Sequence, residues 1–319
     1  MFIVVLGGGV SGLTCGIRLL EAGHTVEVWA REVSPHTTSD VAAAVWYPYR
    51  AWPQERVSAW AKRTYTVLAS LAHAHPEAGI LLVSGVELFR RHVEDPWWRD
   101  SVPDFRRARP EELPPGLLEG YHFTAPVIEM PRYLPFLMSR LRALGGTLVR
   151  REVRSLDEAW ARASLVVNCT GLGARELVGD ATLHPVRGEV LRVSPAPTDR
   201  FLFDDEHEDG IAYVIPRSGD CILGGTVEEG NGSLTPDPAV ARGILARNAP
   251  LLPPGAVLNV VEHKVGLRPG RPTVRLEAEV IAGRVVVHDY GHGGAGVTLS
   301  WGCAEEVVAL VAAHQTQLT

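Results

Sequence analysis

The sequence predicts an α/β plus α+β protein, in which a parallel-sheet domain is interrupted by an inserted antiparallel-sheet domain. Three observations carry this prediction. The chain opens with FIVVLGGGVSGLTCG, which is typical of a strand, a glycine run and a helix. A second junction of this kind, VVVHDYGHGGAGVTLSWG, starts at Val285. Between the two junctions, several segments alternate apolar and polar residues, as half-buried antiparallel strands do.

The first junction has the pattern of a nucleotide-binding loop. Residues 2–6 form a continuous apolar run, as in a buried parallel strand, and Gly7-x-Gly9-x-x-Gly12 follows directly before a helical pattern. Gly7 permits the tight turn, Gly9 lets a pyrophosphate approach the backbone, and Gly12 lets helix and strand pack closely. A phosphate would then lie at the helix N-terminus, where free N–H groups favour negative charge.

An acidic residue at the end of the second strand, TVEVW, would hold the ribose hydroxyl groups. Glu27 has the expected spacing but lies within the strand. Glu32, just past it, is the better candidate, although Arg31 beside it is unexpected in that role.

The middle of the chain mixes helices and strands. Residues 54–75 and 131–144 have helical patterns, and GILLVSGVELFRR predicts a hairpin with its turn at Ser84 and Gly85. TLVRREV and SLVVNCTG are predicted strands that return to the first domain. From Val186 the alternation in RGEVLRV, IAYVIP, CILGGTV and VLNVVEHKVGLR predicts the antiparallel sheet.

These patterns divide the chain into two interleaved domains. The nucleotide-binding domain is expected to comprise 1–50, 134–182 and 263–319. The substrate-binding domain is expected to comprise 51–133 and 183–262.

The second glycine junction distinguishes between cofactors. A nicotinamide enzyme needs one such loop, whereas a long FAD lies across a whole domain and can contact a second one. The helix from about Gly296 would direct its N-terminus at the flavin and stabilise negative charge there. The sequence therefore predicts a Rossmann-like FAD-binding domain.

The composition argues against several other classes of protein. The net charge of −6 and the pI near 6.1, without any basic run, argue against a nucleic-acid partner. The longest apolar runs are too short for a membrane span, and no secretory signal is apparent. Four scattered cysteines lack zinc spacing, so we expect no metal site and a cytoplasmic protein with reduced thiols. Only two lysines, Lys62 and Lys264, reduce the prospect of a pyridoxal-phosphate enzyme.

Seven segments carry a family resemblance over nearly the whole chain: LGGGVSGL, TTSDVAAAVWYPY, VNCTGLGA, RGEVLRV, AYVIPRSGDCILGGT, VGLRPGRP and HDYGHGGAGVTLSWG. Together, and in this order, they resemble the D-amino-acid oxidases, the group that includes D-aspartate oxidase and, more distantly, glycine oxidase. The resemblance implies oxidation of a D-amino acid by transfer of its α-hydrogen as hydride to N5 of FAD. Oxygen would reoxidise the flavin to give hydrogen peroxide, and water would hydrolyse the imine to a 2-oxo acid and ammonia. No obligatory catalytic acid or base is implied.

The resemblance also assigns substrate-binding residues. Arg268 matches the arginine that pairs with the substrate carboxylate, for which a guanidinium fork is well shaped, and Arg271 is a weaker alternative. Tyr213 matches the tyrosine that also holds the carboxylate, and Gly294 the glycine whose carbonyl accepts from the substrate amine. His292 is interpreted as a packing residue or a neighbour of the flavin.

The cofactor-binding residues implied by the resemblance form four groups. They are Gly7, Gly9, Val10, Ser11 and Gly12 at the pyrophosphate; Arg31, Glu32 and Val153 at the adenosine; Thr38, Ser39, Ala43, Ala44 and Trp46 along the flavin; and Gly293, Gly294, Gly296, Val297 and Thr298 at the flavin ring. For Thr38 and Ser39, capping of a turn is the simpler alternative.

One departure from the family pattern bears on the preferred substrate. Asp209, four residues before Tyr213, stands where the family has a tyrosine lid residue. It belongs to the run DDEHED, interpreted as a solvated loop whose negative field favours neutral or basic substrates over D-aspartate. Arg50 or Arg217 would reverse this preference if either pointed into the pocket. D-aspartate oxidase and, less favoured, glycine oxidase stay as alternatives. A nicotinamide dehydrogenase and a non-catalytic FAD-binding protein are further competing classes, and a homodimer is a further hypothesis.

Overall fold

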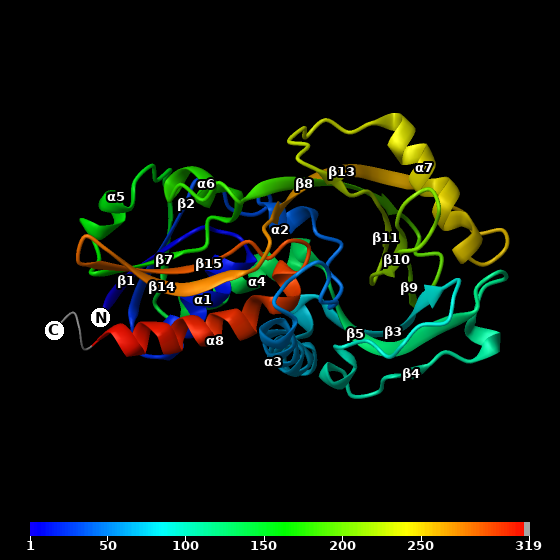
Figure 1. The fold of residues 1–319 in the computed structure, drawn as a ribbon, viewed down its shortest axis with the longest axis horizontal. Helices are drawn as coiled ribbons and strands as arrows, with labels where there is room; N and C mark the ends of the chain where they lie inside the picture. The colour runs from blue at the N-terminus through cyan, green and yellow to red at the C-terminus, as the bar shows by residue number, and fades with distance from the viewer. Residues whose placement is uncertain (316–319) are drawn as a thin grey trace.

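Two β-sheets lie end to end in the computed structural model, which describes residues 1–315 (Figure 1). The first sheet has six strands in the order β14-β15-β7-β1-β2-β6. All neighbours in it are parallel except β14 and β15. Its strands are β1 (Phe2–Leu6), β2 (Thr25–Ala30), β6 (Thr147–Arg150), β7 (Leu165–Asn168), β14 (Arg275–Ile281) and β15 (Arg284–Tyr290).

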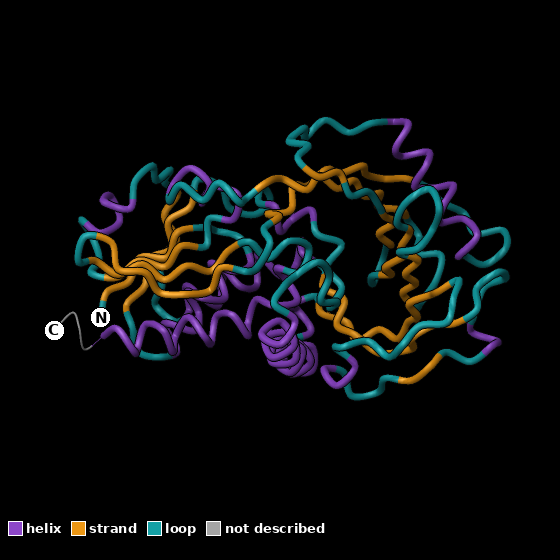
Figure 2. The backbone as a smooth tube through the Cα atoms, viewed as in Figure 1, coloured by secondary structure: helices purple, strands orange, loops and turns teal. Residues whose placement is uncertain are grey.

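Helices cover both faces of this sheet, which is why its strands are apolar throughout. Ile3 and Val5 face one core with α1 (Val10–Glu21), and Val4 and Leu6 face another with α5 (Leu156–Trp160). The helices α4 (Met130–Ala143) and α8 (Gly296–Gln315) lie on the same side as α1, as Figure 2 shows. The sequence therefore predicted the parallel sheet with its buried strands correctly.

Helix α8 is the one helix within residues 1–315 that is long and apolar enough, over Gly296–His314, to cross a membrane. This finding differs from the expectation that no apolar run is long enough. Because α8 packs against α1 and α3 (Gln54–Ala74), its apolar residues belong to the protein core.

The second sheet has nine strands in the order β12-β8-β11-β10-β9-β3-β5-β4, with β13 also paired to β8. It is antiparallel except for the pair β3 and β9. Its strands are β3 (Ile80–Phe89), β4 (Arg106–Arg107), β5 (Glu119–Ile128), β8 (His184–Val193), β9 (Phe201–Asp204), β10 (Ala212–Pro216), β11 (Cys221–Gly224), β12 (Glu228–Glu229) and β13 (Val260–Gly270). The remaining helices are α2 (Thr38–Val41), α6 (Ala174–Leu177) and α7 (Pro238–Asn248), with 3₁₀ turns η1 (Pro76–Ala78), η2 (Arg99–Ser101), η3 (Pro110–Glu112), η4 (Gly171–Gly173) and η5 (Ala249–Leu251).

The predicted hairpin at Ser84 and Gly85 is wrong. Both residues lie inside the continuous strand β3, paired with Thr124 and Phe123. A Cβ atom at Gly85 would lie 2.3 Å from the ring of Phe201. This glycine therefore permits close packing of neighbouring strands, which a local pattern cannot distinguish from a turn.

One predicted domain boundary cuts through a strand. Strand β13 pairs with β8 along its whole length to Gly270, so residues 263–270 lie in the nine-stranded sheet. By sheet membership, the chain returns to the first domain with β14 and not at residue 263.

Candidate active site

A cavity of about 1010 Å³ lies where the two sheets meet. On one side it is lined by the loops that follow β1, β7 and β15, at the carboxyl edge of the parallel strands, where open α/β sheets bind ligands. On the other side it is lined by residues of β8, β9, β10 and β13. Both predicted glycine junctions therefore open into one cavity.

The first glycine loop has the geometry of a phosphate-binding turn. Gly7 adopts a φ of 117°, and a Cβ atom on it would lie 2.3 Å from the carbonyl oxygen of Cys169. A Cβ atom on Gly12 would lie 1.9 Å from the carbonyl oxygen of Gly7. Gly12 itself is buried beneath the loop, so its role is close packing, as expected. Gly9 has no side chain to cap α1, and apart from the N–H of Val10, which donates to Ser39, the first N–H groups of the helix are available to an anion.

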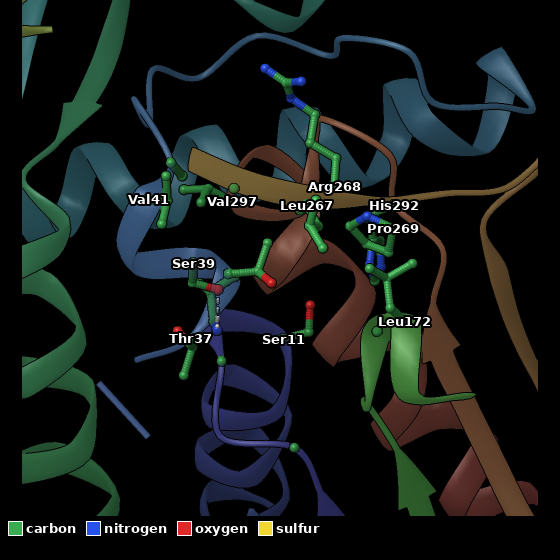
Figure 3. A pocket seen from close by; sticks show the side chains of 18 of the residues that line it. Ser11, Thr37, Ser39, Val41, Leu172, Leu267, Arg268, Pro269, His292 and Val297 are labelled. Carbon is green, nitrogen blue, oxygen red and sulfur yellow. Dashed lines mark hydrogen bonds between the residues drawn. The ribbon is translucent and has the colours of Figure 1, made fainter. Parts of the chain in front are cut away.

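Helix α2 is bonded to the start of α1, next to this loop, through Ser39. The hydroxyl oxygen of Ser39 accepts a hydrogen bond of 3.0 Å from the N–H of Val10 (Figure 3). Capping of α2 is provided by Thr37 and Asp40, since the Asp40 carboxylate accepts from the N–H and the hydroxyl of Thr37. Thr38 and Ser39 instead line the cavity, as the cofactor assignment expects.

The predicted adenosine end contains Arg31, Glu32 and Val153, all of which line the cavity. The Glu32 carboxylate accepts a hydrogen bond of 2.8 Å from Arg150, which holds it at the rim. Glu27 lies outside the lining residues of the described chain, with its carboxylate bonded to Trp29 and Arg162. The structure thus places the better of the two predicted acidic residues at the cavity.

The second glycine junction packs on the segment that follows α2. A Cβ atom on Gly293 would lie 2.5 Å from the carbonyl oxygen of Arg50, and one on Gly294 would lie 2.5 Å from the Tyr49 ring. The Thr298 hydroxyl donates to the Tyr47 carbonyl oxygen at 2.9 Å and accepts from the Tyr47 N–H at 3.1 Å. The following predicted residues of these two segments line the cavity: Ala43, Ala44, Gly293, Gly294, Gly296, Val297 and Thr298.

His292 also lines the cavity, and the carboxylate of Asp289 fixes its ring. Its Nε2 atom lies 3.0 Å from a carboxylate oxygen of the buried Asp289, whose other oxygen accepts from the thiol of Cys15. Burial raises the pKa of the Cys15 thiol, so the thiol stays protonated and can donate. This arrangement agrees with a packing role for His292 beside the cofactor.

Arg268 and Tyr213 converge in the cavity from neighbouring parts of the nine-stranded sheet. The guanidinium group of Arg268 donates to the carbonyl oxygen of Thr226 at 3.1 Å and points away from Ser11 and Ser39 (Figure 3). Gly188 leaves space for it, since a Cβ atom there would lie 2.3 Å from Nη1 of Arg268.

The Tyr213 ring rests on Gly224, where a Cβ atom would lie within 1.8 Å of it. Burial raises the pKa of Tyr213, although Arg268 acts in the opposite direction. Its hydroxyl therefore stays protonated at neutral pH and can donate to a carboxylate.

Four residues that the sequence analysis considered for the cavity, one tryptophan and three arginines, lie outside its lining. Trp46 was expected at the flavin, but its indole is fully buried and donates to the carbonyl oxygen of Ala61, outside the cavity. The apolar and aromatic pattern of this segment does not say which ring faces inward. Arg50, Arg217 and Arg271 also lie outside the lining residues of the described chain. Each forms an ion pair, with Glu229, Asp220 and Asp180 respectively.

The sequence analysis did not identify five residues that line the same cavity as Arg268. They are Tyr47, Tyr49, Phe203, Asp205 and Ile211. Asp209, expected at a lid position, is exposed and does not line the cavity. No local signal identified Asp205, because it lies in the turn after β9 and not within the alternating strand.

The fold and the cavity are those of the class of dinucleotide-binding proteins, with two glycine junctions lining one cavity. The family model for FAD dependent oxidoreductases (DAO) matches residues 3–310, and the chain belongs to this family. FAD is accordingly its cofactor, and the cradle around Gly7, Gly9 and Gly294 fits such a group.

Known relatives agree with this family. The chain is 56% identical over 312 residues to a D-amino-acid oxidase of Rubrobacter xylanophilus, covering 97% of this chain and 95% of the relative. It is 38% identical over 323 residues to the human D-aspartate oxidase, covering 97% and 94%. Among solved structures, glycine oxidase from Geobacillus kaustophilus superposes with a TM-score of 0.80 at 19% identity, covering 98% and 94%, which shows a shared fold. The resemblance drawn from the sequence motifs is confirmed.

Proposed function

We propose that this chain is a FAD-dependent D-amino-acid oxidase. It would convert a D-amino acid, oxygen and water into a 2-oxo acid, ammonia and hydrogen peroxide. The observation that carries the proposal is the convergence of Arg268, Tyr213 and Gly294 in the cavity that both glycine junctions line. The 56% identity to a relative named D-amino-acid oxidase supports it.

The chain's own residues bind and orient the substrate. Arg268 forms two parallel hydrogen bonds to the α-carboxylate, and the Tyr213 hydroxyl donates a third. The carbonyl oxygen of Gly294 accepts from the α-amine. The two glycine junctions, around Gly9 and Gly294, would hold FAD, which would supply an acceptor for the α-hydrogen and a route for its electrons to oxygen. Positioning by these three residues accounts for catalysis without a side-chain acid or base.

The substrate is proposed to carry a neutral or basic side chain. A dicarboxylate would need a second cation in the cavity, and Arg50 and Arg217 are instead paired with Glu229 and Asp220. D-aspartate oxidase activity is the second candidate, because the human D-aspartate oxidase is 38% identical to this chain. Glycine oxidase activity is less favoured, since that comparison supports only the fold.

The first test is anaerobic reduction of the FAD-loaded protein. D-alanine, D-valine, D-aspartate and glycine are added separately, with L-alanine and L-valine as controls, and the flavin absorbance is recorded. Bleaching by a neutral D-amino acid and not by its L-form is expected. Bleaching by D-aspartate alone would favour the second candidate, and the absence of any bleaching would refute the proposal.

A substitution then tests the site. Arg268→Ala is expected to keep bound FAD and lose about 10³-fold or more in kcat/KM, because a buried charge-assisted contact to the substrate is removed. Arg284→Ala is the matched control, since that exposed arginine pairs with Asp157 and neither residue lines the cavity. Unchanged turnover of Arg268→Ala would overturn the assignment.

The proposal includes three simpler hypotheses about partners and location. The protein acts on a small molecule without membrane or nucleic acid, works in the cytoplasm, and forms a homodimer. Light scattering of the FAD-loaded protein measures the oligomeric state directly.

A further inference from the structure

Three consecutive acidic residues at the end of β9 have different surroundings. Asp204 accepts two hydrogen bonds from Arg90, one of them 2.7 Å long, and Glu206 pairs with Arg91 at 2.6 Å. Asp205 lies between them and, within residues 1–315, forms no ion pair and no side-chain hydrogen bond. Strand β9 ends at Asp204, and in the turn that follows Asp205 lines the cavity while Asp204 and Glu206 are bonded to their arginines.

The side that Asp205 faces is the cavity that also contains Arg268. Phe203, two residues earlier, lines the same cavity, and its ring centroid lies 5.4 Å from that of Tyr47. Tyr49 lies near both charges: burial raises its pKa, Asp205 raises it further, and Arg268 lowers it. One cavity therefore presents a cation and an anion that are not paired with each other.

We propose that Asp205 is a specificity residue that binds the cationic side chain of a basic D-amino acid, of the lysine, ornithine or arginine type. This inference rests on the proposed oxidase function and names its substrate class. Arg268 would hold the α-carboxylate while Asp205 holds the distal cation. The apolar stem of such a substrate would pack on the rings of Tyr47 and Phe203.

The other charged groups around this position leave Asp205 as the principal anion. Glu87 lies behind Tyr47 and is bonded to its hydroxyl at 2.7 Å. Burial, with smaller contributions from Asp205 and Glu206, raises the pKa of Glu87 to about 8, so it is neutral at pH 7. Asp205 reaches solvent through the open cavity, and desolvation by the surrounding cavity residues, together with the neighbouring Asp204 and Glu206, raises the pKa of Asp205 to about 6. At pH 7 to 8, Asp205 is therefore mostly ionised and without a countercharge, which a cationic ligand would supply.

The test compares three substrates with the FAD-loaded enzyme at pH 8: D-lysine, D-norleucine as its uncharged analogue, and D-glutamate. The variant is Asp205→Asn, which keeps the shape and removes the charge. Asp209→Asn is the matched control, because this exposed residue of the same acidic loop lies outside the cavity. Initial rates of oxygen consumption give kcat and KM for each pair.

The expected result is a loss of about 10-fold or more in kcat/KM for D-lysine in Asp205→Asn, mainly through a higher KM. D-norleucine should change by less than about two-fold, D-glutamate should improve, and Asp209→Asn should match the parent for all three. Equal losses for D-lysine and D-norleucine, or no loss for either, would overturn the role of Asp205. A parent enzyme that oxidises D-norleucine but not D-lysine would also overturn it, whereas inactivity toward every D-amino acid would refute the oxidase function itself.

Discussion

Glu87 gives the protein a pH-dependent instability that one substitution should remove. Its carboxyl group is buried on β3, one oxygen accepts from the Tyr47 hydroxyl, and the other has no partner among the described residues. Burial, opposed in part by the bond from Tyr47, raises its pKa from about 4.5 to about 8. Since the folded state keeps a proton that the unfolded state has released, stability falls as the pH rises between these two values.

The size of the effect follows from the shift. Each pH unit between 4.5 and 8 costs about 1.4 kcal/mol of unfolding free energy, with an upper bound of roughly 5 kcal/mol over the whole window. Glu87→Gln cannot ionise, and its side-chain carbonyl still accepts from Tyr47. Between pH 5.5 and 7.5 the variant should therefore gain about 3 kcal/mol relative to the parent. For a chain of this length that is about 4 °C in Tm.

Differential scanning calorimetry of the FAD-loaded proteins, at fixed protein, FAD and salt concentrations, measures this difference at several pH values. The Tm of Glu87→Gln minus that of the parent should grow steadily with pH and level off above about pH 8. Glu208→Gln, a change in the exposed acidic loop, should give a constant difference. Parallel curves for Glu87→Gln and the parent would refute the reasoning.

Two further substitutions test the geometry of the cofactor site. Gly12→Ala should abolish the flavin colour of the purified protein, because its Cβ would lie 1.9 Å from the Gly7 carbonyl oxygen, whereas Gly219→Ala, with no atom within 4 Å of its Cβ, should keep it. Trp46→Phe should lower the unfolding free energy by about 1–3 kcal/mol through the lost bond to Ala61, with no change in the Kd of FAD measured by fluorescence titration. Weaker FAD binding without a loss of stability would instead show that Trp46 contributes to the cofactor site.

The sequence predicted those parts of the fold that local patterns determine. A glycine run directly after an apolar strand and before a helix is a specific signal of a nucleotide-binding turn, so both junctions and the parallel sheet were found correctly. Arg268 and Tyr213 were located by motif, and the structure brings them into one cavity although they lie on different strands.

The errors share a physical cause, namely contacts between segments far apart in the chain. Gly85 was interpreted as a turn because its close neighbour, Phe201, lies on another strand. Asp205 is exposed in a turn, as expected for the acidic run, but its place in the cavity lining was missed because lining residues such as Arg268 lie on strands distant in the chain. Trp46 was assigned to the flavin because no local rule says which face of a short segment is buried.

The cavity depends on both ends of the chain, which has a consequence for biosynthesis. The hydroxyl of Thr14 in α1 donates to the carbonyl oxygen of Ser300 in α8, across 286 residues. During synthesis, the pyrophosphate loop therefore leaves the ribosome long before the loop that completes the cavity beside it. A nascent chain that stalls before Thr298 would therefore carry half a cofactor site and should not retain FAD.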